Sequence, residues 1–473
     1  MQGFRAISGA AAVICAVTPS LAFAQTSLAE PERQALEARI AQLENELNNI
    51  KAEIRASSHQ STNKDPILAA SVASQAPALI SPNPQQIAAQ TAPARAPVSA
   101  PILVAPLSEG FRVGDHTIKL GGFIKVDASV SKFSDGNPES TNLGRAAYLP
   151  SSIPIGGEAE DAVTDMNARQ TRFWITSDGV VAGHKVGTRL EMDFQVLPGN
   201  GDSRTTNPAN PAMRRAYITV DNWLIGQDFT NFATPEMHPE TADYVGVTDG
   251  AVLVRQPQVR YSRNGWAISL ENPETTIDPY LSGARITADD NSLPDATASY
   301  TYKASWGQMR LAGLVRQLKY IDRATDIDTT ATGWGLSASA LFKLNQTNDV
   351  RLLVTGGEGI GRYIGLNFGN DAVLDADGQL QALGNLSGFA AYRHVWQPGL
   401  RSNLIASAQI IDNPEHLTGP LVNRSATSVR GNLIWSPFKT FDLGTELMFG
   451  KREIQNGDSG DLTRLVLFAK YGF

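Results

Sequence analysis

The last twelve residues, 462–473, constrain the fold of this chain more than any other segment. Alternate residues counted back from the end would lie on one face of a strand: Phe473, Tyr471, Ala469, Leu467 and Leu465. The other face carries Lys470 and Arg464, although Val466 and Phe468 interrupt it. This alternation with an aromatic end is typical of the last strand of an outer-membrane β-barrel. Such a strand pairs with the first strand and leaves no open edge in lipid.

Residues 1–24 have the features of a secretory signal peptide. Arg5 supplies a basic start, residues 7–17 are mostly apolar or small, and Ala22-Phe23-Ala24 fits an A-x-A cleavage site. The apolar run is too short to serve instead as a membrane anchor. We expect the mature chain to begin at Gln25.

The only cysteine of the chain, Cys15, lies within this signal peptide. A mature chain without cysteine has no disulfide, no thiol nucleophile and no cysteine-ligated metal. It also has no further apolar stretch long enough for a transmembrane helix, so a membrane-spanning chain of this kind must be a barrel. The net charge of −7 argues against binding to nucleic acid.

Residues 25–56 are expected to contain a short periplasmic coiled coil. Apolar side chains spaced alternately four and three residues apart form its seam: Leu36, Ile40, Leu43, Leu47, Ile50 and Ile54. In this register Arg39 would face Glu44, and Glu46 would face Lys51, in a parallel partner chain. The alternative is a single amphipathic helix packed on its own protein. The seam does not distinguish a dimer from a trimer.

Residues 57–110 are predicted to be a disordered linker. The segment is rich in Ala, Ser, Gln and Pro, has eight prolines and has no aromatic residue before position 111. Prolines prevent a long helix, and a segment without aromatic residues has little with which to build a core. The linker could therefore hold the coiled coil away from the rest of the chain.

Residues 111–473 are predicted to form one strand after another. In residues 117–131, for example, Ile124 and Val126 share one face and Lys125 lies on the other. The same alternation predicts sixteen strands, at 117–131, 168–178, 184–197, 212–222, 223–230, 257–263, 265–272, 296–306, 308–320, 332–344, 348–360, 385–396, 400–412, 425–435, 439–449 and 462–473. We therefore predict an all-β fold, a 16-stranded antiparallel transmembrane β-barrel preceded by a short coiled-coil helix and a Pro/Ala-rich linker.

Short and long connections alternate between these strands. Longer loops are expected at 132–167, 198–211, 231–256, 273–295, 321–331, 361–384, 413–424 and 450–461, with tight turns such as Asn264-Gly265 between the other pairs. Bacterial barrels have short periplasmic turns and longer external loops, which would place both termini in the periplasm. A soluble β-sandwich is the competing fold, but it does not require a signal peptide, a terminal phenylalanine and alternating connections together.

If the apolar strand faces contact lipid, the opposite faces line the lumen. Candidate pore-lining basic residues are Arg172, Arg189, Arg215, Arg260, Arg310, Arg351, Arg401, Arg430 and Arg464, with Lys119, Lys125, Lys185, Lys303 and Lys470. Fewer acidic residues share these faces: Asp127, Glu191, Asp193, Asp221 and Glu446. A basic lumen would attract anions, and guanidinium groups can hold carboxylates. The arginines could also pair with acidic neighbours and brace the wall, and the two roles are compatible.

The loop at 231–256 is the third long one, and in sixteen-stranded porins the third loop usually folds into the lumen and narrows it. Its candidate constriction residues are Glu236, Glu240, Asp243 and Asp249. These carboxylates could equally be solvated charges at the mouth. His238 has no His or Cys partner at ligand spacing, so no metal site is expected.

Catalytic motifs such as G-x-S-x-G, a P-loop or H-E-x-x-H do not occur in the sequence, so we expect neither an enzyme nor a cofactor. The favoured hypothesis is a passive channel that prefers anions. The alternative is a structural anchor whose coiled coil tethers the barrel to the periplasm or cell wall, with peptidoglycan or periplasmic proteins as partners. A hydrolase hidden in the barrel wall is a minor third hypothesis.

The order of signal peptide, coiled coil, linker and barrel resembles the DcaP-like trimeric outer-membrane porins. The residues that carry the resemblance are Leu224-Ile-Gly-Gln-Asp-Phe-Thr-Asn-Phe232, Pro239-Glu-Thr-Ala-Asp243, Val254-Arg-Gln-Pro-Gln-Val-Arg-Tyr261, Arg172-Phe173 and Leu190-Glu-Met-Asp-Phe194. The resemblance implies a homotrimer in outer-membrane lipid and lipopolysaccharide, with one pore per subunit. It also implies uptake of small organic anions such as dicarboxylates, with Arg255 and Arg260 as the best-matched residues of the anion path.

Overall fold

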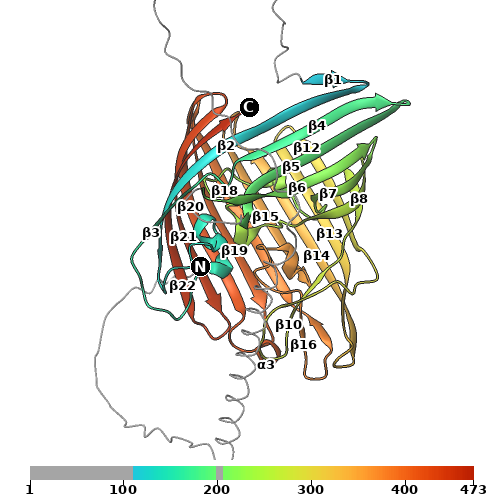
Figure 1. Cartoon of the computed structure of the whole chain (residues 1–473), viewed down its shortest axis with the longest axis vertical. Coiled ribbons are helices and arrows are strands. Elements are labelled where there is room, and N and C mark those ends of the chain that lie inside the picture. Colours follow the sequence, from blue (N-terminus) through green and yellow to red (C-terminus); the bar gives the residue numbers. More distant parts are fainter. Residues whose placement is uncertain (1–109, 199–205) are drawn as a thin grey trace, which may run out of the picture. The chain divides into compact units, whose positions relative to one another are not determined.

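A computed structural model describes residues 110–198 and 206–473, which form a closed 16-stranded antiparallel β-barrel (Figure 1). The predicted number of strands is confirmed. The wall strands are β2 (His116–Phe133), β4 (Arg172–Val181), β5 (His184–Pro198), β6 (Ala209–Val220), β7 (Trp223–Phe229), β8 (Arg255–Arg263), β9 (Trp266–Glu271), β12 (Asp295–Ala304), β13 (Gly307–Asp322), β14 (Ile327–Lys343), β15 (Asp349–Glu358), β18 (Gly384–Gln397), β19 (Leu400–Asp412), β20 (Asn423–Phe438), β21 (Phe441–Ile454) and β22 (Ser459–Gly472). The predicted signal peptide, coiled coil and linker lie outside the described residues.

The last strand closes the barrel against the first. β22 pairs with β2 from Phe123 opposite Gly472 to Phe133 opposite Leu462. Beyond this ladder, the N–H of Phe473 donates to the carbonyl oxygen of Gly122 at 3.0 Å, and the N–H of Gly122 donates back at 3.2 Å. Backbone groups at the seam are therefore paired inside the protein, as lipid requires.

Two shorter strands extend β2 on its other edge and at its start. β3 (Val163–Asn167) pairs with the half of β2 that β4 does not reach, and β1 (Phe111–Val113) pairs with the beginning of β2. Connections at one end of the barrel are tight, and we call this the short-turn end. In the Asn264-Gly265 turn both residues have positive φ, 51° and 85°, as a two-residue hairpin turn of type I′ requires.

The predictions of long loops at 321–331 and 450–461 are wrong. β13 and β14 stay paired up to Asp322 opposite Ile327, and β21 and β22 up to Glu453 opposite Ser459. Three threonines and one isoleucine occur among the first six residues of β14, and β-branched residues favour extended backbone. Polar residues in these extensions interrupt the apolar alternation. The sequence pattern therefore did not show that the strands continue beyond their apolar, lipid-facing part.

Two of the remaining long loops join into a second sheet at the long-loop end. Its strands run in the order β11 (Ile286–Ala288), β10 (Thr275–Asp278), β16 (Ala372–Leu374) and β17 (Leu380–Ala382). Ile277, Ala372 and Leu380 pack with Leu318 of β13 in one buried cluster. The sheet thus fastens the loops between β9 and β12 and between β15 and β18 to the barrel wall.

The short helical segments all lie in connections. They are α2 (Leu143–Ala146), η2 (Pro150–Ser152), η3 (Pro235–Met237), η4 (Thr248–Gly250), η5 (Gly361–Tyr363) and α3 (Glu415–Thr418). No helix in residues 110–198 or 206–473 is long and apolar enough to cross a membrane.

Apolar side chains on the strands face outward, as the alternation predicts. On β22, Leu465 and Leu467 are 42% and 54% exposed. The interruptions of the pattern face inward instead: Val466 and Phe468 are 4% and 8% exposed and pack against Ala242 of the loop between β7 and β8. The irregularity in the last strand therefore marks a place where the lumen is filled.

Replacing Arg316 should loosen the second sheet without opening the barrel. Arg316 of β13 lies 2.9 Å from Asp371 and 3.3 Å from Asp295, and all three side chains are fully buried. Removing one member of a buried ionic group commonly costs about 3–5 kcal/mol. Arg316→Met should therefore speed protease cleavage within residues 359–383, measured on the purified protein. Arg323→Met, at an exposed site in the β13–β14 turn, should not; equal cleavage of both variants would contradict this role for Arg316.

Candidate functional site in the lumen

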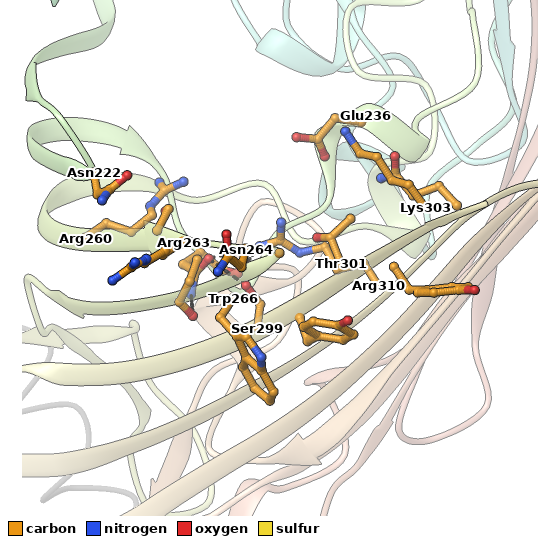
Figure 2. Close-up of a pocket in the computed structure, with 17 residues that line it drawn as sticks. Asn222, Glu236, Arg260, Arg263, Asn264, Trp266, Ser299, Thr301, Lys303 and Arg310 are labelled. Carbon is orange, nitrogen blue, oxygen red and sulfur yellow. Dashed lines mark hydrogen bonds between the residues drawn. The ribbon is translucent and has the colours of Figure 1, made fainter. Parts of the chain in front are cut away.

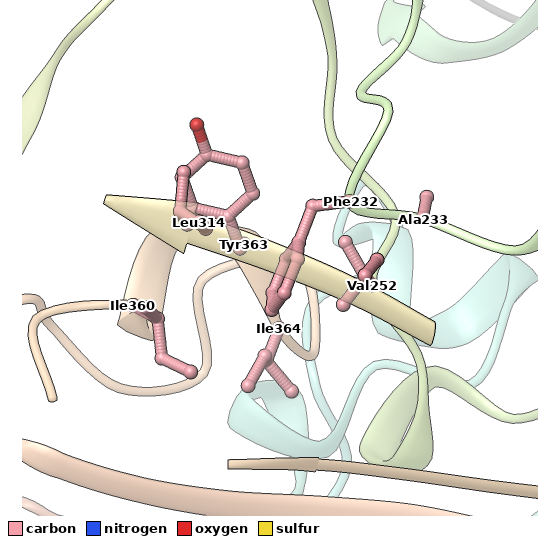
Figure 3. Close-up of a cluster of buried hydrophobic side chains, with 8 residues drawn as sticks. Phe232, Ala233, Val252, Leu314, Ile360, Tyr363 and Ile364 are labelled. Carbon is pink, nitrogen blue, oxygen red and sulfur yellow. The ribbon is translucent and has the colours of Figure 1, made fainter. Parts of the chain in front are cut away.

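The loop between β7 and β8, residues 230–254, lies along the inner wall of the barrel. Phe232 and Val252 pack with Leu314 of β13 and Tyr363 of η5 in one buried cluster (Figure 3). A second cluster joins the loop to β15, β18 and β19: Met237, Val247, Ala251, Leu253, Leu353, Phe389, Ala391 and Ile405. Burial of apolar side chains on both sides of the loop holds it inside the lumen.

Asp249 fixes the middle of this loop to the wall. Its carboxylate accepts hydrogen bonds from Ser407 of β19 at 2.5 Å, Ser428 of β20 at 3.1 Å and the phenol of Tyr148 at 3.2 Å. The next residue, Gly250, touches β18 so closely that a Cβ there would lie 2.5 Å from the carbonyl oxygen of Gly388. Burial raises the pKa of Asp249 above its usual value.

Asp243 and Glu240 are likewise occupied by partners. Asp243 is buried and accepts from the backbone N–H groups of Tyr148 and Gly246 at 2.7 and 3.0 Å. Glu240 receives a forked hydrogen bond from Arg401 at 2.8–3.0 Å. Burial alone would raise the pKa of Glu240, but the hydrogen bonds and charge of Arg401 outweigh it and hold that pKa below its usual value.

Glu236 is the exception among the four predicted loop carboxylates. Its side chain is exposed, and no basic group in the described residues lies within 4 Å of its oxygens. The structure therefore places Glu236 at the open lumen, whereas Glu240, Asp243 and Asp249 serve to seat the loop.

Five arginines cluster on the wall that the loop faces, and we call them the arginine wall: Arg172 in β4, Arg189 in β5, Arg214 and Arg215 in β6, and Arg255 in β8. The shortest ion pairs within this group are Arg172–Asp193 at 3.1 Å, Arg189–Glu191 at 2.6 Å, Arg214–Asp193 at 2.7 Å and Arg215–Asp228 at 2.6 Å. Three carboxylates thus pair with four of the five guanidinium groups, and Arg255 has no carboxylate within 4 Å in the described residues.

Tyr244 of the loop touches the arginine wall. Its hydroxyl donates to Asp193 at 2.9 Å, and its ring centre lies 5.1 Å from the guanidinium carbon of Arg214 and 5.9 Å from that of Arg172. Cations at such distances are attracted to the ring face. The loop and the arginine wall therefore meet, and the passage is narrowed here.

Sequence reasoning missed Arg214, because strand alternation assigned the lumen to Arg215 alone. The β5–β6 ladder shifts register between Glu191 and Met192, and this irregularity turns both arginines inward. Arg316 and Arg393 were also missed, although Arg316 has the same parity as Arg310, the predicted lumen residue on its strand. Tyr244 carried no signal, because its position depends on the folded loop.

The other predicted lumen arginines lie at separate places around the wall. Arg260 is 3.5 Å from Asp228, Arg351 is 2.7 Å from Asp349, Arg401 is 2.8 Å from Glu240 and fully buried Arg430 is 3.5 Å from Glu446. Arg464 is also buried and donates to Ser131 and to the carbonyl oxygen of Gly144. Bracing of the wall therefore accounts for many of the predicted basic residues.

The predicted lumen lysines likewise differ in burial and in their partners. Lys125 is buried and donates to Gln170 and to the carbonyl oxygen of Ala242, and Lys470 lies 2.8 Å from Asp442. Lys119, Lys185 and Lys303 are exposed. Asp221 lies at a tight turn beside His184 rather than deep in the lumen.

Besides Arg464, two predicted arginines have no carboxylate within 4 Å among the described residues. The guanidinium of Arg255 lies over the ring of Phe229, 4.1 Å from its centre, and its Nε has no hydrogen-bond partner. Arg310 of β13 donates from Nη2 to the two oxygens of Asn231 at 2.7 and 3.0 Å, and its Nε is also unpartnered. These two groups keep an uncompensated positive charge.

A cavity of about 850 Å³, which we call the lower cavity, lies between the loop and the short-turn end (Figure 2). Arg260, Arg263, Lys303 and Arg310 line it, and Glu236 is its one acidic residue. An adjoining space of about 330 Å³ shares Glu236, Arg260 and Arg310 and extends to Arg215 of the arginine wall. The basic groups therefore follow the open space. No set of His, Cys, Asp or Glu side chains in the described ranges could hold a metal ion.

Comparison with protein families matches residues 109–473 to the DcaP outer membrane proteins. The chain belongs to this family. The outer membrane channel DcaP of Acinetobacter baumannii is similar in structure, with a TM-score of 0.63 and 24% identity over 77% of this chain and 99% of that chain. An anion-selective porin from Comamonas acidovorans gives a TM-score of 0.47 at 11% identity, covering 76% of this chain and 100% of that one. No curated protein matches the chain.

Releasing the inserted loop of this DcaP-family protein should widen the passage. Asp249→Ala removes the acceptor that two serines and Tyr148 share, so the loop should leave the wall part of the time. We expect single-channel conductance in planar bilayers to rise roughly twofold, because the constriction sets the resistance of a pore. Asp249→Asn keeps the shape of the side chain and one acceptor oxygen, so it should change the conductance less. Asp458→Ala, at an exposed turn, is the control; conductance that is unchanged in Asp249→Ala would contradict the anchoring role.

Proposed function

We propose that this outer-membrane barrel is a passive, water-filled channel that prefers small organic anions. The observation that carries the proposal is the uncompensated charge of Arg255 and Arg310 beside the narrowed passage. Fixed positive charge in a confined space raises the local concentration of anions and lowers that of cations. The similar protein from Acinetobacter baumannii is described as an outer membrane channel, which agrees with this proposal.

Dicarboxylates are the solutes we favour within this class. Basic side chains occur at two successive levels, the arginine wall and the lower cavity, so a solute with two carboxylates meets partners along its path. Guanidinium groups also suit carboxylates, because they can donate two parallel hydrogen bonds. The family resemblance adds the proposal of a homotrimer with a periplasmic N-terminal segment, and no catalytic role is proposed.

Neutralising both uncompensated arginines should weaken anion preference. For Arg255→Gln with Arg310→Gln, we expect the anion-to-cation permeability ratio to fall roughly threefold, since two positive charges leave the passage. The measurement is the zero-current potential of the purified protein in a planar bilayer under a potassium chloride gradient. The control Arg424→Gln removes one positive charge from a pair with Glu453 outside the passage and should leave the ratio unchanged.

The sign of the wild-type potential tests the function itself. An anion-selective potential supports the proposal, and a cation-selective one would mean that lumen carboxylates dominate. No conductance at all would favour the alternative, a structural anchor. That alternative rests on the heptad seam from Leu36 to Ile54 and the proline-rich linker. Deletion of residues 25–107 that spares transport but weakens the cell envelope would support tethering.

A further inference from the structure

The lower cavity has a marked imbalance of charge. Four of its lining side chains are basic and one is acidic. Only Arg260 among the four has a carboxylate within 4 Å in the described chain, at 3.5 Å from Asp228. Arg263, Lys303 and Arg310 therefore face the cavity without an ion-pair partner.

Glu236 reaches this cavity from the inserted loop. It lies in η3, between buried Met237 and the half-buried Pro235, so its backbone is held while its side chain is exposed. In Figure 2 its side chain extends on the same side of the cavity as Lys303 and Arg310. No ion pair within 4 Å holds it, unlike Glu240 with Arg401.

Arg310 is well placed to be the group that a carboxylate would bind. Asn231 orients its guanidinium through Nη2 alone, which leaves donors of the fork free. Asn231 is itself buried and fixed by a hydrogen bond from its Nδ2 to Thr297 at 3.0 Å. Such a pre-oriented guanidinium loses little freedom when it binds an anion.

We propose that the lower cavity is an anion-binding site for small organic carboxylates, separate from the arginine wall. In this site Glu236 is a tethered competitor for Arg310 and sets the affinity of the site for the solute. The inference rests on the proposed anion channel and goes beyond it by assigning a site and a specificity-determining residue. A carboxylate held within side-chain reach acts at an effective concentration on the order of millimolar. A solute carboxylate must compete with Glu236 for Arg310, so it binds weakly enough to leave again, as conduction requires.

The test is the concentration at which succinate-carried current is half saturated, measured in planar bilayers with potassium succinate. Removal of the competitor in Glu236→Gln should lower this concentration about fivefold, the scale of an exposed ion pair. Arg310→Gln should raise it, and adding Glu236→Gln to Arg310→Gln should have little further effect, because the two residues act on one step. Glu158→Gln, an exposed glutamate outside the cavity, is the matched control of charge.

The outcomes separate this inference from the proposed function. If the wild type conducts succinate but Glu236→Gln leaves the half-saturating concentration unchanged, the competitor role of Glu236 is overturned. The proposed channel function is then unaffected. An effect of Glu236→Gln that persists in full in the presence of Arg310→Gln would also overturn the competitor role. The cause would then be the change of charge in the lumen as a whole, not competition for Arg310. If the wild type carries no anion current, the proposed function fails first.

Discussion

The packing of residues 230–254 against the inner wall is the interaction on which the rest of the lumen depends. A barrel of sixteen strands is wide enough to leave an aqueous channel unless something fills it. Two apolar clusters and the carboxylate of Asp249 place the loop inside. Two features of the passage then follow from where the loop lies. One is the contact of Tyr244 with the arginine wall, and the other is the lower cavity on the other side of the loop.

The inserted loop also explains why so many charges in the lumen are paired. Filling the lumen removes water from wall residues such as Glu446 and Arg430, and a charge taken out of water is costly unless it is paired or hydrogen-bonded. Arg430 and Glu446 accordingly lie 3.5 Å apart, with both side chains fully buried. Where open space remains, water solvates charge, and unpaired groups such as Arg310 can persist. Burial decides which basic residues brace the wall and which remain available to a solute.

Period-two alternation and the terminal Phe473 were sufficient to predict the number of strands and the closure of the barrel, because lipid enforces both. The same alternation found the outward faces, and most lumen arginines followed from parity. Parity could not reveal Arg214, since a register shift depends on pairing with β5. Nor could it explain inward Val466 and Phe468, because their partner, Ala242, is 224 positions or more away along the chain. Long-range packing supplies what the local pattern lacks.

Net charge is a poor guide to the selectivity of such a pore. The chain carries −7 overall, yet the lower cavity is lined by four basic residues and one acidic residue. Carboxylates on loop surfaces are screened within about 8 Å at physiological ionic strength, so they scarcely act on a solute in the lumen. A group like Arg310 acts on it directly, at hydrogen-bonding distance and in a confined space. The few side chains that the fold leaves unpaired beside the passage therefore determine the charges that a solute meets there. Glu236 is one of these side chains, and its charge is opposite to that of Arg310.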